Sequence, residues 1–141
     1  MNAPLPKSPL RHLTTVVRSL MGLAFLIFGL NGFLHFIPQP KDAMSAGALD
    51  FFNALVKTGY MIPLIFCTQT LAGALLLFNL FVPLALALLA PVVVNIVVFH
   101  LQLPPTGIPV AAVVLILELY LAWAYRKAFA PMLVMRAVPH A

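Results

Sequence analysis

Long apolar stretches dominate the chain, and polar residues gather in the short segments between them. Each stretch could cross a hydrocarbon core of about 30 Å as a helix, at about 1.5 Å per residue. The connections between the second and third stretches, and between the third and fourth, are short enough for helical hairpins. The pattern predicts an all-α polytopic membrane protein, an antiparallel bundle of four transmembrane helices spanning approximately residues 14–37, 60–80, 83–103 and 109–129.

The segment from residue 42 to residue 58 has a different pattern. Apolar Leu49, Phe52 and Val56 alternate with polar residues at helical spacing. Such a pattern is typical of a helix that lies in the membrane interface with one face in the lipid. We therefore expect a short amphipathic helix between the first and second spans.

Composition supports a membrane environment. Of the 141 residues, 63% are hydrophobic and 8% are charged, whereas soluble domains carry about 25% charged residues. The lipid bilayer is the expected partner. Nucleic acid is not, because the basic residues gather near the two ends of the chain, where they act as a topology signal. The single cysteine, Cys67, excludes an internal disulfide or a dithiol redox centre.

The distribution of lysine and arginine predicts the orientation. Basic residues cluster before the first span and after the last, so the positive-inside rule places both termini in the cytoplasm. The first apolar stretch is too long for a signal peptide and is read as an uncleaved span. We expect a cytoplasmic lead over residues 1–12, a transmembrane domain over residues 13–129 and a cytoplasmic tail over residues 130–141.

Glu118 is the most informative candidate site residue, because it stands in the middle of the last span. A carboxylate there costs about 2.5–3.5 kcal/mol on insertion scales. Gln69 and Asn95 fall at a similar depth on two other helices. These three residues either form a hydrogen-bond network that holds the bundle together, or line a buried proton-accepting or ligand-binding site.

Arg18 and Asn31 are further ligand-binding candidates on the first span. Arg18 shares a helical stripe with Gly22 and Gly29, which is typical of a helix-packing seam. Its guanidinium could extend to cytoplasmic headgroups or pair with Glu118. Asn31 lies roughly opposite this stripe, so the first span cannot turn both sets fully toward one bundle axis. We expect one of the two sets to meet the amphipathic segment or a neighbouring subunit.

His35 and His100 are candidates near the outer side of the membrane. Two histidines at similar depth could ligate a haem or a metal ion. However, Asn95 and His100 lie about 140° apart around their helix and would not face one pocket. We interpret both histidines as interfacial residues bonded to backbone or water, and expect neither a metal site nor a haem.

The polar positions carry a resemblance to a known family. They stand in the run from Arg18 to Phe33, in the stretch from Gln69 to Leu77, and in the Ala-Pro-Val-Val-Val-Asn run that leads to His100. Over nearly its whole length the chain resembles DoxX-like proteins, which are related to the DoxD subunit of thiosulfate:quinone oxidoreductase. Many relatives carry a carboxylate where Gln69 stands, a position for which Glu118 could substitute.

The resemblance implies a four-helix protein of the bacterial inner membrane with a link to redox metabolism. Our leading hypothesis is a redox-associated accessory subunit that binds a quinone or another apolar ligand, and that acts with a redox partner or as a homo-oligomer. The alternatives are a structural or assembly protein without a ligand, and a minimal small-molecule transporter. The sequence identifies no catalytic residue.

Overall fold

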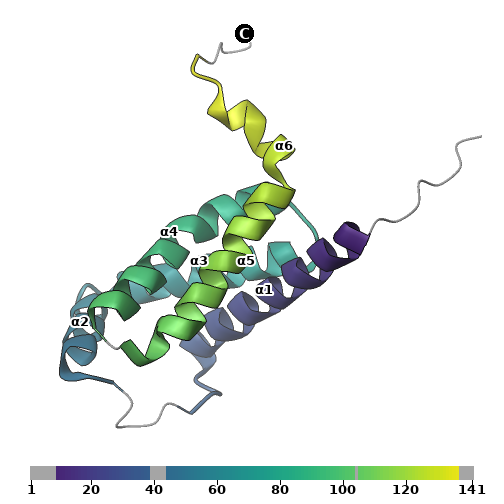
Figure 1. Ribbon diagram of the computed structural model, residues 1–141. Coiled ribbons are helices and arrows are strands. Elements are labelled where there is room, and N and C mark those ends of the chain that lie inside the picture. Colours follow the sequence, from purple (N-terminus) through teal and green to yellow (C-terminus); the bar gives the residue numbers. More distant parts are fainter. Residues whose placement is uncertain (1–8, 39–43, 104, 137–141) are drawn as a thin grey trace, which may run out of the picture.

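The computed structural model describes residues 9–38, 44–103 and 105–136, and every regular element in these ranges is helical. The elements follow the order of the chain (Figure 1). They are α1 (Pro9–Leu34), α2 (Ala46–Lys57), α3 (Met61–Leu77), α4 (Val82–Gln102), the 3-10 turn η1 (Pro105–Gly107), α5 (Ile108–Ala124), α6 (Arg126–Phe129) and the 3-10 turn η2 (Ala130–Leu133).

The helices are long and apolar enough to indicate a membrane protein. Within the described residues, α1 and α4 each meet the length and hydropathy expected of a membrane span. The shorter α3 meets them together with α2, at a bend of 94°, and the shorter α5 meets them together with the α6–η2 segment, at a bend of 73°. The structure therefore holds two clear candidate spans, or up to four if each bent pair counts as one.

Several helix boundaries differ from those expected from the sequence, including the end of α3, which stops at Leu77 and not near residue 80. Helix α1 already includes Pro9, so residues 9–12 of the expected lead are helical; proline suits the first turn, where its missing N–H is not needed. The same helix ends at Leu34, where His35 takes a φ of 52°. Helix α5 ends at Ala124, before a bend at Tyr125. The rest of the lead (1–8), residues 39–43 and the tail beyond residue 136 lie outside the described residues.

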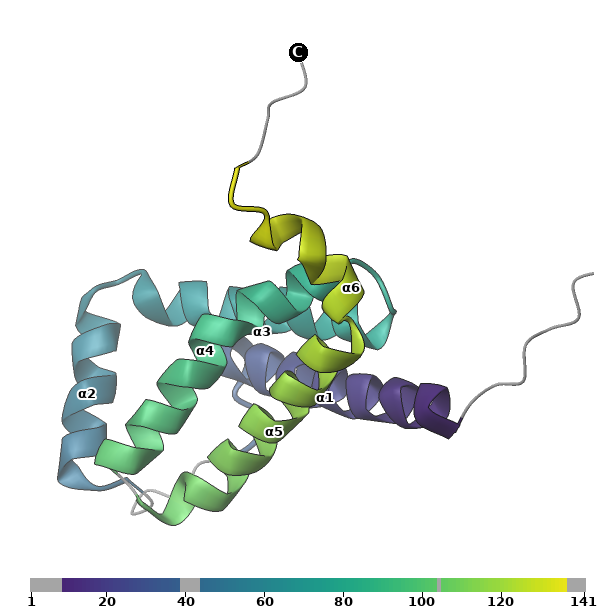
Figure 2. The same cartoon turned by 45° about the horizontal axis from the view of Figure 1, so that its top comes forward.

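Helices α1, α3, α4 and α5 lie side by side and enclose one apolar core. The largest interface joins α1 to α3, and α4 packs against both α3 and α5. The amphipathic helix expected between the first two spans is present as α2, with Ser45 as its N-cap. It crosses one end of the bundle, whereas the start of α1 and the end of α5 lie at the opposite end (Figure 2).

Glycines allow α1 and α3 to approach closely. A Cβ on Gly22 would stand 2.6 Å from the backbone nitrogen of Leu77, and a Cβ on Gly29 would stand 2.6 Å from the backbone nitrogen of Thr70. This confirms the packing seam predicted from the stripe that Arg18, Gly22 and Gly29 share. Small residues serve this purpose in membrane helices, because they let backbones meet without an intervening side chain.

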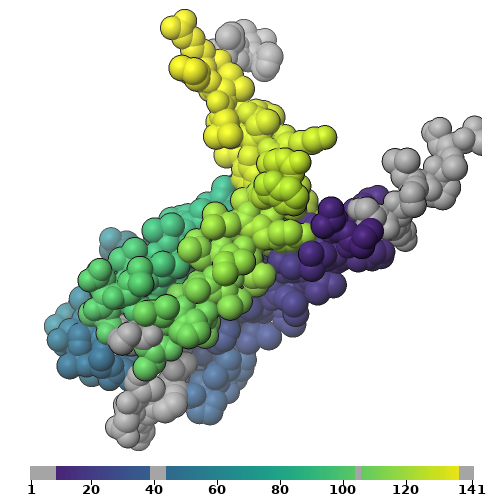
Figure 3. Space-filling model, viewed as in Figure 1, coloured from purple at the N-terminus to yellow at the C-terminus, as the bar shows by residue number. Residues whose placement is uncertain are grey.

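The C-terminal segment stands apart from the bundle. Helix α6 and η2 project away from the body of the molecule (Figure 3). Leu133 and Met135 expose 79% and 100% of their surface there. An apolar segment with this much exposure needs a lipid or protein surface to cover it.

Candidate functional site

Glu118 lies within the bundle, as the sequence predicts. It is only 6% exposed on α5, where it shares a face with the buried Ala111 and Leu121. Its Oε2 atom is buried and has no hydrogen-bond partner. A carboxyl oxygen left without a partner in such surroundings is costly, and intramembrane carboxyl groups commonly mark functional sites.

A pocket of about 270 Å³ lies among α1, α3, α4 and α5, in the half of the bundle near α2. All four helices contribute to its walls. The walls are mostly apolar, and the polar exceptions are Gln69 from α3 and His100 from α4. The lining residues are Ala24, Phe25, Phe28, Gln69, Ile96, His100, Val110 and Val114.

Glu118 does not line this pocket, but it lies close to it along α5. Val114, which does line the pocket, precedes Glu118 by one helical turn on the same face. Glu118 therefore lies one helical turn beyond the pocket wall, toward the C-terminal end of α5. Of the polar groups expected at mid-membrane, Gln69 is half-buried and lines the pocket, whereas Glu118 is buried and does not line it.

His100 is held at the pocket by its neighbours. Its ring meets Phe99 edge-on, with 5.1 Å between the ring centroids. A Cβ at Gly107, in the turn before α5, would collide with the imidazole. The absence of a side chain at Gly107 thus leaves the space that the His100 ring occupies.

Asn95 does not join Gln69 and Glu118. It is exposed on the outer surface of α4, whereas His100 on the same helix lines the pocket. This corrects the expectation that Asn95 shares a buried polar layer with the other two residues. The physical reason is the angular separation of Asn95 and His100 around α4, which prevents both from facing inward.

Arg18 is buried, with 7% exposure, and it acts on the backbone of α3. Its Nη1 donates to the carbonyl oxygen of Leu76 and, at 3.3 Å, to that of Leu77. These carbonyls belong to the last turn of α3, and that of Leu76 also accepts a hydrogen bond of 3.2 Å from the backbone N–H of Asn79. Among the described residues no ion pair joins Arg18 to Glu118, so the pairing weighed from the sequence is not observed.

Asn31 has a local structural role. Its Oδ1 accepts a hydrogen bond of 2.6 Å from the backbone N–H of Ile37, in the segment that follows α1. The backbone N–H of His35 donates to the Asn31 carbonyl at 2.9 Å. The chain after α1 therefore folds back over Asn31 and buries it, while His35 stays exposed. These two residues do not line the apolar pocket.

Sequence reasoning missed the aromatic and aliphatic residues that form the pocket walls. Phe25, Phe28 and Ile96 are ordinary residues of apolar helices, and no local signal separates pocket walls from lipid-facing positions. Within the described residues, no group of three or more histidine, cysteine, aspartate or glutamate side chains is placed to hold a metal ion.

The geometry can accommodate an apolar ligand with a polar edge. Apolar walls would bury its rings or chain, the Gln69 amide would contact its polar atoms, and the His100 ring would contact its edge. Comparison of the chain with protein-family models, curated proteins and solved structures finds no match, so the resemblance to DoxX-like proteins stays a prediction.

Proposed function

We propose that this chain is a DoxX-like protein of the bacterial inner membrane, a four-span bundle that binds a quinone or a similar apolar carbonyl compound. In this proposal α3 and α5 are the second and fourth spans, in addition to α1 and α4. Both termini face the cytoplasm. The ligand would serve a redox partner, for which this chain acts as an accessory subunit. The observation that carries the proposal is the apolar pocket to which all four helices contribute.

The chemistry of the pocket suits a quinone. The ring and tail of a quinone are apolar and would lie against Phe25, Phe28 and Ile96. Its two carbonyl oxygens accept hydrogen bonds, and the Gln69 amide group has two N–H donors. His100 stands on α4 in the same lining and would contact the edge of the ring.

Glu118 would act behind the pocket. Reduction of a quinone consumes protons, and a buried carboxyl one turn below Val114 is a group that can hold and release one. Its Oε2 is buried without a hydrogen-bond partner and Glu118 does not line the pocket, so the carboxyl would hold its proton without touching the ligand. Glu118 is a positioning or proton-holding residue in this proposal, and Gln69 is the direct contact.

Equilibrium binding to the purified full chain in a neutral detergent tests the proposal. A short-chain benzoquinone and a short-chain naphthoquinone are the probes, measured by equilibrium dialysis. Replacing Gln69 with leucine removes the donor and keeps the size of the side chain. Loss of one hydrogen bond of about 1 kcal/mol weakens binding about fivefold. Ala24→Trp, which fills the pocket from α1, should abolish binding.

Asn95→Leu is the matched control, because it removes the same kind of amide from the exposed face of α4. It should leave the dissociation constant unchanged. If Gln69→Leu and Ala24→Trp bind the quinones as tightly as the original chain, the pocket is not the binding site and the proposal fails.

A purely structural role is the rival, and one observation favours it. Two of the polar candidates, Arg18 and Asn31, use hydrogen bonds to hold the chain itself together. A structural role predicts that the pocket substitutions leave quinone binding unchanged. It also predicts that the polar substitutions change only the unfolding temperature. Dialysis and thermal unfolding of the same variants therefore separate the two functions.

A further inference from the structure

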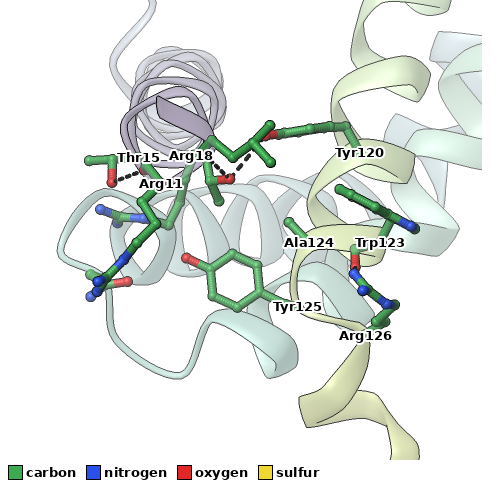
Figure 4. A pocket seen from close by; sticks show the side chains of 11 residues that line it. Arg11, Thr15, Arg18, Tyr120, Trp123, Ala124, Tyr125 and Arg126 are labelled. Carbon is green, nitrogen blue, oxygen red and sulfur yellow. Dashed lines mark hydrogen bonds between the residues drawn. The ribbon is translucent and has the colours of Figure 1, made fainter. Parts of the chain in front are cut away.

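A second pocket, of about 450 Å³, lies at the end of the bundle opposite α2. It opens between the first turns of α1, the α3–α4 connection and the end of α5 (Figure 4). Its lining differs in kind from that of the apolar pocket. It contains three arginines, Arg11, Arg18 and Arg126, together with hydroxyl and aromatic side chains.

The basic character extends beyond this pocket. An adjoining hollow shares Arg11 and Arg126 with it and adds Lys127. Neither lining contains an acidic side chain among the residues described. Of the three acids of the chain, Glu118 is buried in the core and Asp50 lies on α2 at the far end. The positive charges of this region are therefore not neutralised by a carboxylate that lines it.

Arg18 gives the pocket a fixed inner wall. It is 7% exposed, and both of its hydrogen bonds to α3 start from Nη1. An arginine has five N–H donors in a rigid plane. The bonds to Leu76 and Leu77 hold this plane in place, and Arg18 is among the residues that line the pocket.

Arg126 is held in a similar way at the outer wall. Its guanidinium carbon lies 4.7 Å above the Trp123 ring, and its Nη1 donates to the Trp123 carbonyl oxygen at 2.9 Å. Stacking on an indole restricts an arginine without neutralising its charge. Figure 4 shows Arg11 on the α1 side and Arg126 on the α5 side, with the Tyr125 ring between them.

Hydroxyl groups complete the lining. Thr14 and Tyr120 share a hydrogen bond of 2.9 Å between α1 and α5, and Thr15 stands beside them on α1. Because the Thr14 and Thr15 hydroxyls donate to the backbone carbonyl oxygens of Leu10 and Arg11, the guanidinium groups supply the donors that match the oxygen atoms of a phosphate group. Arginine is the residue type that recognises phosphate in a bidentate manner.

We infer that this pocket binds a phosphate group, carried either by an anionic phospholipid or by a small soluble phosphate compound. A lipid headgroup fits the position, because basic pockets between membrane helices on the cytoplasmic side bind such groups. The exposed Trp123 suits the interface where headgroups lie. This inference does not depend on quinone binding, since the two pockets share no lining residue.

The test measures lipid binding to the purified full chain in neutral detergent by native mass spectrometry. Dioleoylphosphatidylglycerol is compared with dioleoylphosphatidylcholine, which has a zwitterionic headgroup. We expect the anionic lipid to bind at least about fivefold more tightly. The double substitution Arg11→Gln and Arg126→Gln should remove this preference. Both residues are exposed, so this variant should fold, whereas a change at Arg18 would also disturb α3.

The matched control removes the same number of positive charges elsewhere, through Lys57→Gln and Arg136→Gln. Both residues are exposed and neither lines the pocket. The control should keep the preference for the anionic lipid. Equal loss in the two double variants would show only a general attraction to positive charge, and would overturn the inference. The inference would also be overturned if the two lipids bound equally and glycerol 3-phosphate did not bind.

Glycerol 3-phosphate separates the two sources of the phosphate group. If it binds the original chain and displaces phosphatidylglycerol, the pocket accepts soluble phosphate compounds. If the lipid binds and an excess of glycerol 3-phosphate does not displace it, the acyl chains are needed and the ligand is a phospholipid. Both results support a phosphate site, provided that the Arg11 and Arg126 double variant loses the binding.

Discussion

Gly22 and Gly73 face each other across the α1–α3 interface, and a side chain on either would collide with the backbone of the other. A Cβ added to Gly22 would lie 2.9 Å from the carbonyl oxygen of Gly73, and a Cβ added to Gly73 would lie 2.9 Å from the carbonyl oxygen of Gly22. Contacts this short involve rigid backbone on both sides. The close approach of α1 and α3 therefore depends on the absence of two methyl groups.

Replacing Gly73 with alanine should destabilise the protein. Its Cβ would also collide with the backbone of Leu26, so α1 and α3 would have to move apart. Overpacking of this kind costs about 1–3 kcal/mol, although alanine is the better helix former. Thermal unfolding in detergent should show a lower midpoint for Gly73→Ala.

Gly47→Ala is the control for this prediction. Gly47 lies in α2, and its added Cβ would meet only the end of the Leu103 side chain, at 3.0 Å. A flexible side chain can move, so the midpoint should not fall. An unchanged midpoint for Gly73→Ala would mean that the two helices are not packed this closely.

Arg18→Met should lower the unfolding midpoint more than the loss of a positive charge at an exposed position does. The substitution keeps an unbranched side chain and removes the donors to the Leu76 and Leu77 carbonyl oxygens. Hydrogen bonds to a charged group contribute about 1.5–3 kcal/mol. Arg136→Met, at an exposed position, should leave the midpoint unchanged. Equal midpoints for the two variants would contradict the role of Arg18 at the end of α3.

Glu118→Met, unlike Arg18→Met, should not lower the unfolding midpoint. The carboxyl group is buried and its Oε2 has no hydrogen-bond partner, so an apolar side chain of similar shape removes a cost of about 1–3 kcal/mol. We expect the unfolding midpoint to stay the same or rise. If Glu118 were part of a hydrogen-bond network that holds the bundle, the midpoint would fall, as for Arg18→Met. Unfolding of both variants in the same detergent distinguishes these outcomes.

Helical spacing in the sequence was enough to predict the burial of Glu118 and the glycine seam on α1. It also separated Asn95 from His100, but it did not show which of them faces inward. Helices that are apolar on all sides carry little amphipathic signal, so one face cannot be told from another. Packing of α4 against the other helices determines which of its faces points inward. His100 lies in the pocket lining, and Asn95 is exposed on the outer surface.

Asn31 and the basic pocket depend on contacts that helical spacing does not describe. Asn31 is buried because the chain beyond α1 folds back and donates the Ile37 N–H to it. Arg11 and Arg126 lie near opposite ends of the sequence, where both act as topology signals. Only the approach of α1 to the end of α5 brings them to one pocket.

The position of α2 and the C-terminal segment at opposite ends of the bundle predicts their sides of the membrane. Cys67 is exposed and can be replaced by alanine to give a chain without cysteine. In that background Asp50→Cys on α2 should react with a membrane-impermeant maleimide in intact spheroplasts. Arg136→Cys should react only after the membrane is permeabilised, because the basic C-terminal segment is expected in the cytoplasm. Reaction of both positions in intact spheroplasts would show that the bundle does not separate them across the membrane, and the reverse pattern would show that the orientation is inverted.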